Sequence, residues 1–154
     1  MFAAVSAGAP AFTKIMLQFT ANHGGSAICV GALKLFDKGR PVAFPTGTKS
    51  EHTGIWSDSF HSDNLLSSSK GHYSSASGSF KAGKGNEKVL VTMPKAVSFD
   101  SFSLRSSPWA GYNPKGFVVT GLRSDGKWVE LRRETVFKFA KAGAVATFKT
   151  YTGI

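Results

Sequence analysis

The chain of 154 residues has the length of one domain, enough to bury a single sizeable core. Its 42% hydrophobic residues and 17 glycines exclude a disordered chain, and 18% charged residues are few for a helix-rich protein. A formal net charge of +10 would attract anionic partners. The basic residues are scattered, however, with Arg132-Arg133 as the only adjacent pair, so a dedicated nucleic-acid site is not favoured. This composition favours an all-β protein.

The first part of the chain alternates apolar and polar residues with a period of two. The runs at residues 14–21 and 27–37 predict two strands, separated by residues 22–26, whose Asn and Gly are typical of a hairpin or loop. The single cysteine, Cys29, cannot form an intrachain disulfide. Its apolar neighbours predict a small buried hydrophobic residue.

The middle of the chain shows weaker patterning. Residues 38–57 sustain neither period, which predicts a long irregular connection. Residues 67–85 are nearly low-complexity Ser, Gly and Lys, with Tyr73 and Phe80 as the only large apolar side chains. We predict a mobile loop there, flanking at most one short strand.

Strand-like alternation returns in the second half, in the runs 87–94, 98–106, 117–121, 129–131, 135–142 and 144–151. Asp125-Gly126 is a dipeptide preferred in tight primed turns, so we predict a hairpin around it. Gly143 separates the last two runs. No helical stripe with a period of 3.6 stands out. The pattern predicts an antiparallel β-sandwich or jelly roll of about eight strands with a long Ser/Gly-rich loop.

Four stretches carry a family likeness in chain order: QFTANHGGSAICVGALKLFDKGRPV, TGIWSDS, VTMPKAVSFDSFSLRSS and PKGFVVTGLRSDGKWVELRRET. They resemble the discoidin family, also called coagulation-factor type C domains, of the galactose-binding-like β-sandwich fold. The likeness is greatest to copies in bacteriophage tail and other virion proteins. It implies an N-terminal arm at residues 1–13, the sandwich at 14–140, and a final strand or C-terminal arm at 141–154.

The resemblance also implies structural roles. Asp125 and Gly126 form the turn of the hairpin, Trp128 covers the edge of the core, and Trp56 is expected inside the core. The sequence departs from the family in two places. Residues 50–54 stand where the family has an Asp-Gly, and the hairpin carries one extra residue before Asp125.

Candidate chemical groups are sparse. Asp58, His61 and Asp63, with His52 close by, form the densest set of potential metal ligands, but their spacing matches no common calcium or zinc pattern. We therefore favour a solvated polar loop and expect no metal. The sequence lacks a Gly-x-Ser-x-Gly elbow, a phosphate-binding glycine loop and any evident pair of catalytic carboxylates. We expect no cofactor and no enzymatic activity.

The loop at residues 105–116 has the composition of a binding loop. Trp109 and Tyr112 lie between prolines and glycines, and Arg105 lies at the end of a strand. We predict a ligand-binding site from Arg105, Trp109 and Tyr112, with His61 as a further contact. The competing interpretation, which we favour for Trp109 itself, is that its side chain folds back over the end of the sandwich as a plug.

Two non-enzymatic functions follow as expectations. The first is a structural component of a virus particle, a capsid decoration or tail protein, that docks to other subunits as part of an oligomer. The second is an adhesin module that binds a cell-surface carbohydrate. The N-terminal residues lack the basic and apolar regions of a signal peptide, and no stretch approaches the roughly 18 apolar residues of a membrane span. We expect location in a virion assembled in the host cytoplasm, without export or membrane insertion.

Overall fold

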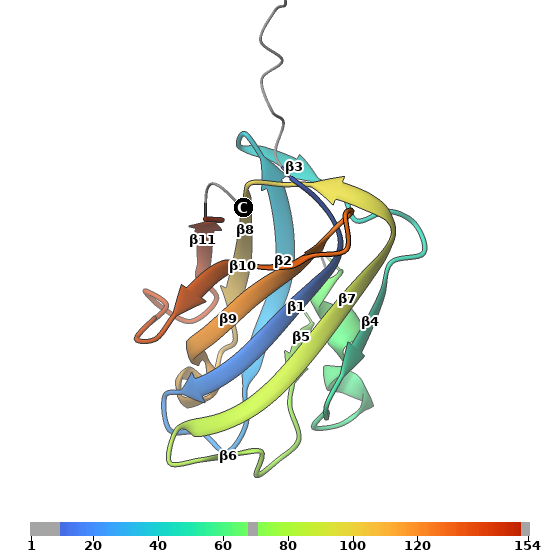
Figure 1. Cartoon of the computed structure of the whole chain (residues 1–154). Helices are drawn as coiled ribbons and strands as arrows, with labels where there is room; N and C mark the ends of the chain where they lie inside the picture. The colour runs from blue at the N-terminus through green and yellow to red at the C-terminus, as the bar shows by residue number, and fades with distance from the viewer. Residues whose placement is uncertain (1–9, 68–70, 152–154) are drawn as a thin grey trace, which may run out of the picture.

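The computed structural model describes residues 10–67 and 71–151, which form two antiparallel sheets (Figure 1). The first sheet has the order β10 (Trp128–Glu134), β9 (Pro114–Arg123), β1 (Ala11–Asn22), β7 (Lys84–Ser98) and β4 (Lys49–His52), with β6 (Phe80–Lys81) also on β7. The second has the order β11 (Val145–Lys149), β8 (Ser101–Ser106), β2 (Cys29–Asp37) and β3 (Arg40–Val42), with β5 (His72–Ser74) also on β2. The predicted all-β sandwich class is confirmed.

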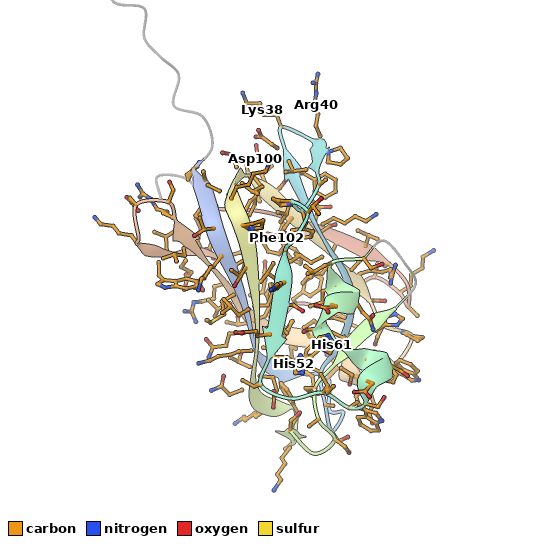
Figure 2. All side chains as sticks on the ribbon, turned by 90° about the vertical axis from the view of Figure 1, so that its right-hand side faces the viewer. Lys38, Arg40, His52, His61, Asp100 and Phe102 are labelled. Carbon is orange, nitrogen blue, oxygen red and sulfur yellow. The ribbon has the colours of Figure 1, made fainter. Side chains whose placement is uncertain are left out.

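The core lies between the two sheets. Because side chains alternate along a strand, Ile15, Leu17 and Phe19 of β1 point to one side, and all three are buried. Leu17 is in register with Val89 of β7 and Val119 of β9, so one apolar face extends across three strands. The second sheet supplies the facing layer, in which Phe102 of β8 lies in the interior (Figure 2).

The two ends of the sandwich have different connections. Tight turns join β2 to β3, β7 to β8 and β9 to β10 at one end, which is uppermost in Figure 1. The register places these turns together, because Ala11 pairs with Ser98 and Phe12 pairs with Arg123. We call this the tight-turn end. The opposite, long-loop end carries the connections 23–28, 53–67, 107–113 and 135–144, including the short 3-10 helices η1 (Asp58–Phe60), η2 (Ser62–Leu65) and η3 (Ala110–Tyr112).

The predicted hairpin is confirmed, but its turn differs from the expected primed type. The Arg123 N–H donates to the Lys127 carbonyl at 2.8 Å, which leaves a three-residue loop at 124–126. Gly126 has φ +90°, whereas Asp125 does not have a positive φ. A three-residue loop that ends on a left-handed glycine suits the twist of the two strands as well as a primed turn does.

Two predictions for the middle of the chain are wrong. Residues 38–57 contain β3 and β4, so the connection is not irregular throughout. Residues 67–85 contain β5, β6 and the start of β7, more than the one short strand expected. The part of that predicted loop at residues 68–70 lies outside the described residues.

The strand predicted at residues 135–142 is also wrong. That segment forms bends and turns, although its alternating phenylalanines are used for packing. Phe139 is buried, and the Phe137 ring lies 6.0 Å from the Phe117 ring and 5.1 Å from the Phe148 ring, centroid to centroid. The following run is confirmed as β11, which pairs with β8.

The described residues contain eleven strands instead of about eight. β1 begins at Ala11, inside the segment expected to be an N-terminal arm. Within the described part of the chain, none of the helices has the length and apolar character needed to cross a membrane.

Candidate ligand-binding site

A cleft of about 270 Å³ opens at the long-loop end, and we call it the aromatic cleft. Its lining comes from the start of β2, the η1 region, β5 and the η3 loop: Cys29, Trp56, Phe60, Ser74, Trp109 and Tyr112. It therefore brings together Trp109 and Tyr112, which were predicted to bind a ligand, with Trp56, which was predicted to be core.

The η3 loop is held by a buried network that centres on Asn113. The Asn113 side-chain oxygen accepts hydrogen bonds from the Ser107 N–H at 2.8 Å and from the Ser107 hydroxyl at 2.9 Å. The Trp109 N–H donates to Ser107 Oγ at 3.3 Å. Because Ser107 and Asn113 are both buried, this network fixes the backbone that carries the Trp109 ring.

The loop between β1 and β2 supports η3 from the other side. The N–H groups of His23 and Gly25 both donate to the Gly111 carbonyl, at 3.2 and 2.9 Å. A Cβ atom at Gly25 would lie 2.9 Å from that carbonyl oxygen, so only glycine allows the two loops to approach this closely. The loop at residues 22–26, which was predicted from its Asn and Gly residues, thus positions one wall of the aromatic cleft.

Trp56 is not in the core, so that prediction is wrong. Its side chain is 46% exposed, and its ring lies 6.3 Å from the Tyr112 ring at an interplanar angle of 79°. The backbone explains this position, because the Trp56 N–H donates to the Ser74 carbonyl of β5 at 2.9 Å. This bond holds the residue at the rim of the second sheet instead of between the sheets.

Trp109 is held at the mouth of the cleft. Its side chain is 47% exposed, and its ring makes edge contacts with the rings of Phe60 at 6.0 Å and His72 at 6.1 Å. A plug would bury most of its apolar area, at a gain of about 25 cal/mol per Å². Trp109 leaves about half of that area in contact with solvent, where a ligand can cover it.

Arg105 borders the cleft without lining it. Its guanidinium crosses Gly31, where a Cβ atom would lie 2.7 Å from Nε, and Nη2 donates to the Gly71 carbonyl at 2.9 Å. Burial, and to a lesser extent the nearby Arg105 charge, lowers the pKa of His72. Arg105 therefore holds the backbone at Gly71. The next residue, His72, carries the ring that contacts Trp109.

His61 belongs to a separate cluster, which Figure 2 shows as a pair with His52. The two rings lie 4.6 Å apart at 88°, His52 Nδ1 is 2.8 Å from Ser62 Oγ, and His61 Nδ1 accepts the Asp63 N–H at 3.0 Å. The structure does not bring His61 into the aromatic cleft. Among the described residues, no group of three or more His, Cys, Asp or Glu side chains is arranged to hold a metal ion. Asp58, His61 and Asp63 therefore do not form such a group.

Three of the residues expected to be structural, Asp125, Gly126 and Trp128, lie at the tight-turn end. Asp125 accepts the Lys127 N–H at 3.2 Å and pairs with the Arg123 guanidinium at 3.0 Å. Gly126 supplies the left-handed position of the turn. Trp128 begins β10 next to this turn, and its side chain is 47% exposed.

Cys29, Phe60 and Ser74 line the cleft and were not predicted as site residues. Cys29 is buried as expected, with 2% of its surface exposed, and burial raises the pKa of its thiol to about 12. It is therefore a neutral, apolar part of the wall. Phe60 had one signal in the sequence, since it is the only aromatic residue in the polar stretch SDSFHSDN.

Comparisons of the chain with protein-family models, with curated proteins and with solved structures give no match. The resemblance to the discoidin family thus rests on the quoted stretches of sequence.

Proposed function

We propose that this protein is a non-enzymatic binding module that recognises a carbohydrate in the aromatic cleft. The observation that carries this proposal is the pair of half-exposed tryptophans, Trp56 and Trp109, on one cleft with Tyr112. Aromatic faces that remain exposed on rigid loops suit the apolar C–H face of a sugar ring.

The size and polar groups of the cleft support the same ligand. A volume of about 270 Å³ is at the lower limit of small-molecule sites, which span about 300–1,000 Å³, and so suits one sugar unit. The Tyr112 hydroxyl, which lies 3.5 Å from Ser26 Oγ, offers a donor or an acceptor for a sugar hydroxyl. A discoidin-like sandwich would agree with this proposal, and the two antiparallel sheets and the 114–134 hairpin support that assignment.

A second candidate function is a structural subunit of a virus particle. Exposed apolar side chains on the C-terminal part of the chain favour it: Val136 is 77% exposed and Val145 is 62% exposed. Such side chains would gain free energy by burial against a neighbouring subunit. In this function the chain docks to copies of itself or to other subunits.

A glycan array with purified protein tests the first proposal. We expect binding to a defined set of glycans, and we expect Trp109→Ala to weaken it by about tenfold or more, as for aromatic anchors that become buried on binding. Trp128→Ala is the matched control, because that tryptophan is equally exposed but lies at the opposite end. Equal loss in both variants, or no binding to any glycan, contradicts the proposal. Stoichiometric incorporation into a large particle without a glycan signal supports the second function instead.

A further inference from the structure

Two clefts with basic residues lie at the same end of the sandwich as the aromatic cleft. The first, of about 280 Å³, is lined by His23, Lys138 and Lys141 together with residues of η3 and the 139–142 loop. The second, of about 480 Å³, is lined by His23, Lys84 and Lys115 together with parts of the 21–24, 82–83 and 135–136 segments. Since His23 belongs to both, we describe them together as the basic clefts.

The positive charge of the basic clefts is not neutralised within the described chain. No Asp or Glu of that part of the chain lines either cleft. None of the described carboxylates makes an ion pair with Lys84, Lys115, Lys138 or Lys141. By contrast, each of the arginines 123, 132 and 133 pairs with a carboxylate at 2.6–3.0 Å. Clustered ammonium groups beside a low-dielectric wall create a local positive potential that attracts anions.

The short helix η3 separates the two kinds of cleft. Ala110 and Gly111 line the first basic cleft, whereas Trp109 and Tyr112 line the aromatic cleft. The partition is fixed, because the Gly111 carbonyl accepts N–H bonds from His23 and Gly25. A polymer with one unit in the aromatic cleft can therefore cross η3 and place its next units over the lysines.

We propose that the ligand is an acidic polysaccharide, whose carboxylate or sulfate groups bind the basic clefts while one sugar ring occupies the aromatic cleft. This inference rests on the proposed carbohydrate-binding function. A polysaccharide is favoured over single-stranded nucleic acid by the distribution of the rings. Nucleic-acid sites use aromatic platforms spaced along a basic groove for successive bases, whereas Trp56, Trp109 and Tyr112 gather in one cleft. No aromatic ring except those of Phe139 and His23 lines the described basic clefts.

Titration calorimetry at two salt concentrations tests this inference with three probes: a sulfated polysaccharide, a polyuronate and an uncharged polysaccharide. We expect acidic probes to bind more tightly than the uncharged one. The double variants Lys138→Ala/Lys141→Ala and Lys84→Ala/Lys115→Ala should each weaken acidic binding by about tenfold and make its salt dependence shallower. The control Lys95→Ala/Lys127→Ala removes the same charge from exposed lysines near the tight-turn end and should change affinity by less than about twofold.

The outcomes separate this inference from the function on which it rests. If Trp109→Ala abolishes binding but the lysine variants and the control behave alike, the polyanion inference is wrong and carbohydrate binding stands. Equal affinity for charged and uncharged probes would also contradict the polyanion inference and leave carbohydrate binding in place. If single-stranded DNA binds more tightly than every polysaccharide, the ligand class is wrong. If no polysaccharide binds at all, both proposals fail.

Discussion

The tight-turn end and the long-loop end of this sandwich are built by different means. At the tight-turn end the backbone itself makes the turns, with Gly39 and Gly126 in left-handed conformations. At the long-loop end buried side chains add to backbone hydrogen bonds such as those from His23 and Gly25 to Gly111. Asn22 donates to the carbonyls of Gly25 and Ala27 at 2.9 and 2.7 Å, and Asn113 organises the Ser107 loop. Long loops are therefore as well determined here as the turns, and they carry the clefts.

The largest expected effect on stability is at the long-loop end. Asn113→Ala leaves the Ser107 N–H and hydroxyl without their buried acceptor, so we expect a loss of about 1–3 kcal/mol in the free energy of unfolding. Urea unfolding measures this loss. Asn86→Ala is the control, because the Asn86 side chain is exposed and bonds only to the amide of Gln18 at 2.9 Å. Equal stability of the two variants would mean that the η3 loop is not fixed by the side-chain network.

The tight-turn end should respond to backbone conformation instead. Gly126→Val places a β-branched residue at φ +90°, and we expect a loss of about 1–2 kcal/mol. Gly126→Asn should cost much less, because Asn tolerates the left-handed region and no heavy atom lies within 4 Å of a Cβ at this position. Chemical unfolding of both variants checks the difference. A similar loss for Val and Asn would contradict a backbone origin.

The smallest effect is a pH dependence near the long-loop end. Burial, followed by the nearby His61, lowers the pKa of His52 below its ordinary value of 6.5, although Asp63 and Glu87 oppose this. The unfolded chain then binds protons before the native state does, so stability is complete above pH 6.5 and falls as the pH drops below it. Burial makes His72 contribute in the same direction.

Thermal unfolding between pH 8 and pH 5 measures this slope. His52→Gln keeps a hydrogen-bonding partner for Ser62 but removes the titration, so we expect a shallower fall in melting temperature with acidification. An unchanged slope in this variant would assign the pH dependence to other groups. A steeper slope would reverse the sign expected from the lowered pKa.

Several strands could be predicted because their burial follows the alternation of the sequence. β1 and β7 each bury one apolar face against the opposite sheet, whereas the first five residues of β2 are all buried. β4 could not be found in this way. Its sequence KSEH has no apolar residue, and the strand forms because its backbone pairs with the edge of β7. Polar edge strands take their conformation from their neighbour instead of from their own pattern.

The site shows the same limit. The composition of residues 105–116 predicted a binding loop that includes Trp109 and Tyr112, and both side chains line the aromatic cleft. The position of Trp56 depends on its N–H bond to Ser74, which lies on a strand that the sequence did not predict. Alternation at Phe137 and Phe139 misled in the other direction, because it predicted a strand that does not form. The two rings instead pack against each other and against the core.

The central place of β1 has a consequence for biosynthesis. This strand pairs along nearly its whole length with β7 and β9, which come much later in the chain. Pairings between distant segments form slowly, because a large loop must close before any contact stabilises it. On the ribosome β1 therefore emerges long before its neighbours exist, and the first sheet can be completed only after β9 and β10 have been synthesised. Until then the edge of β1 that pairs with β9 stays unmatched, and an open strand edge is prone to aggregation.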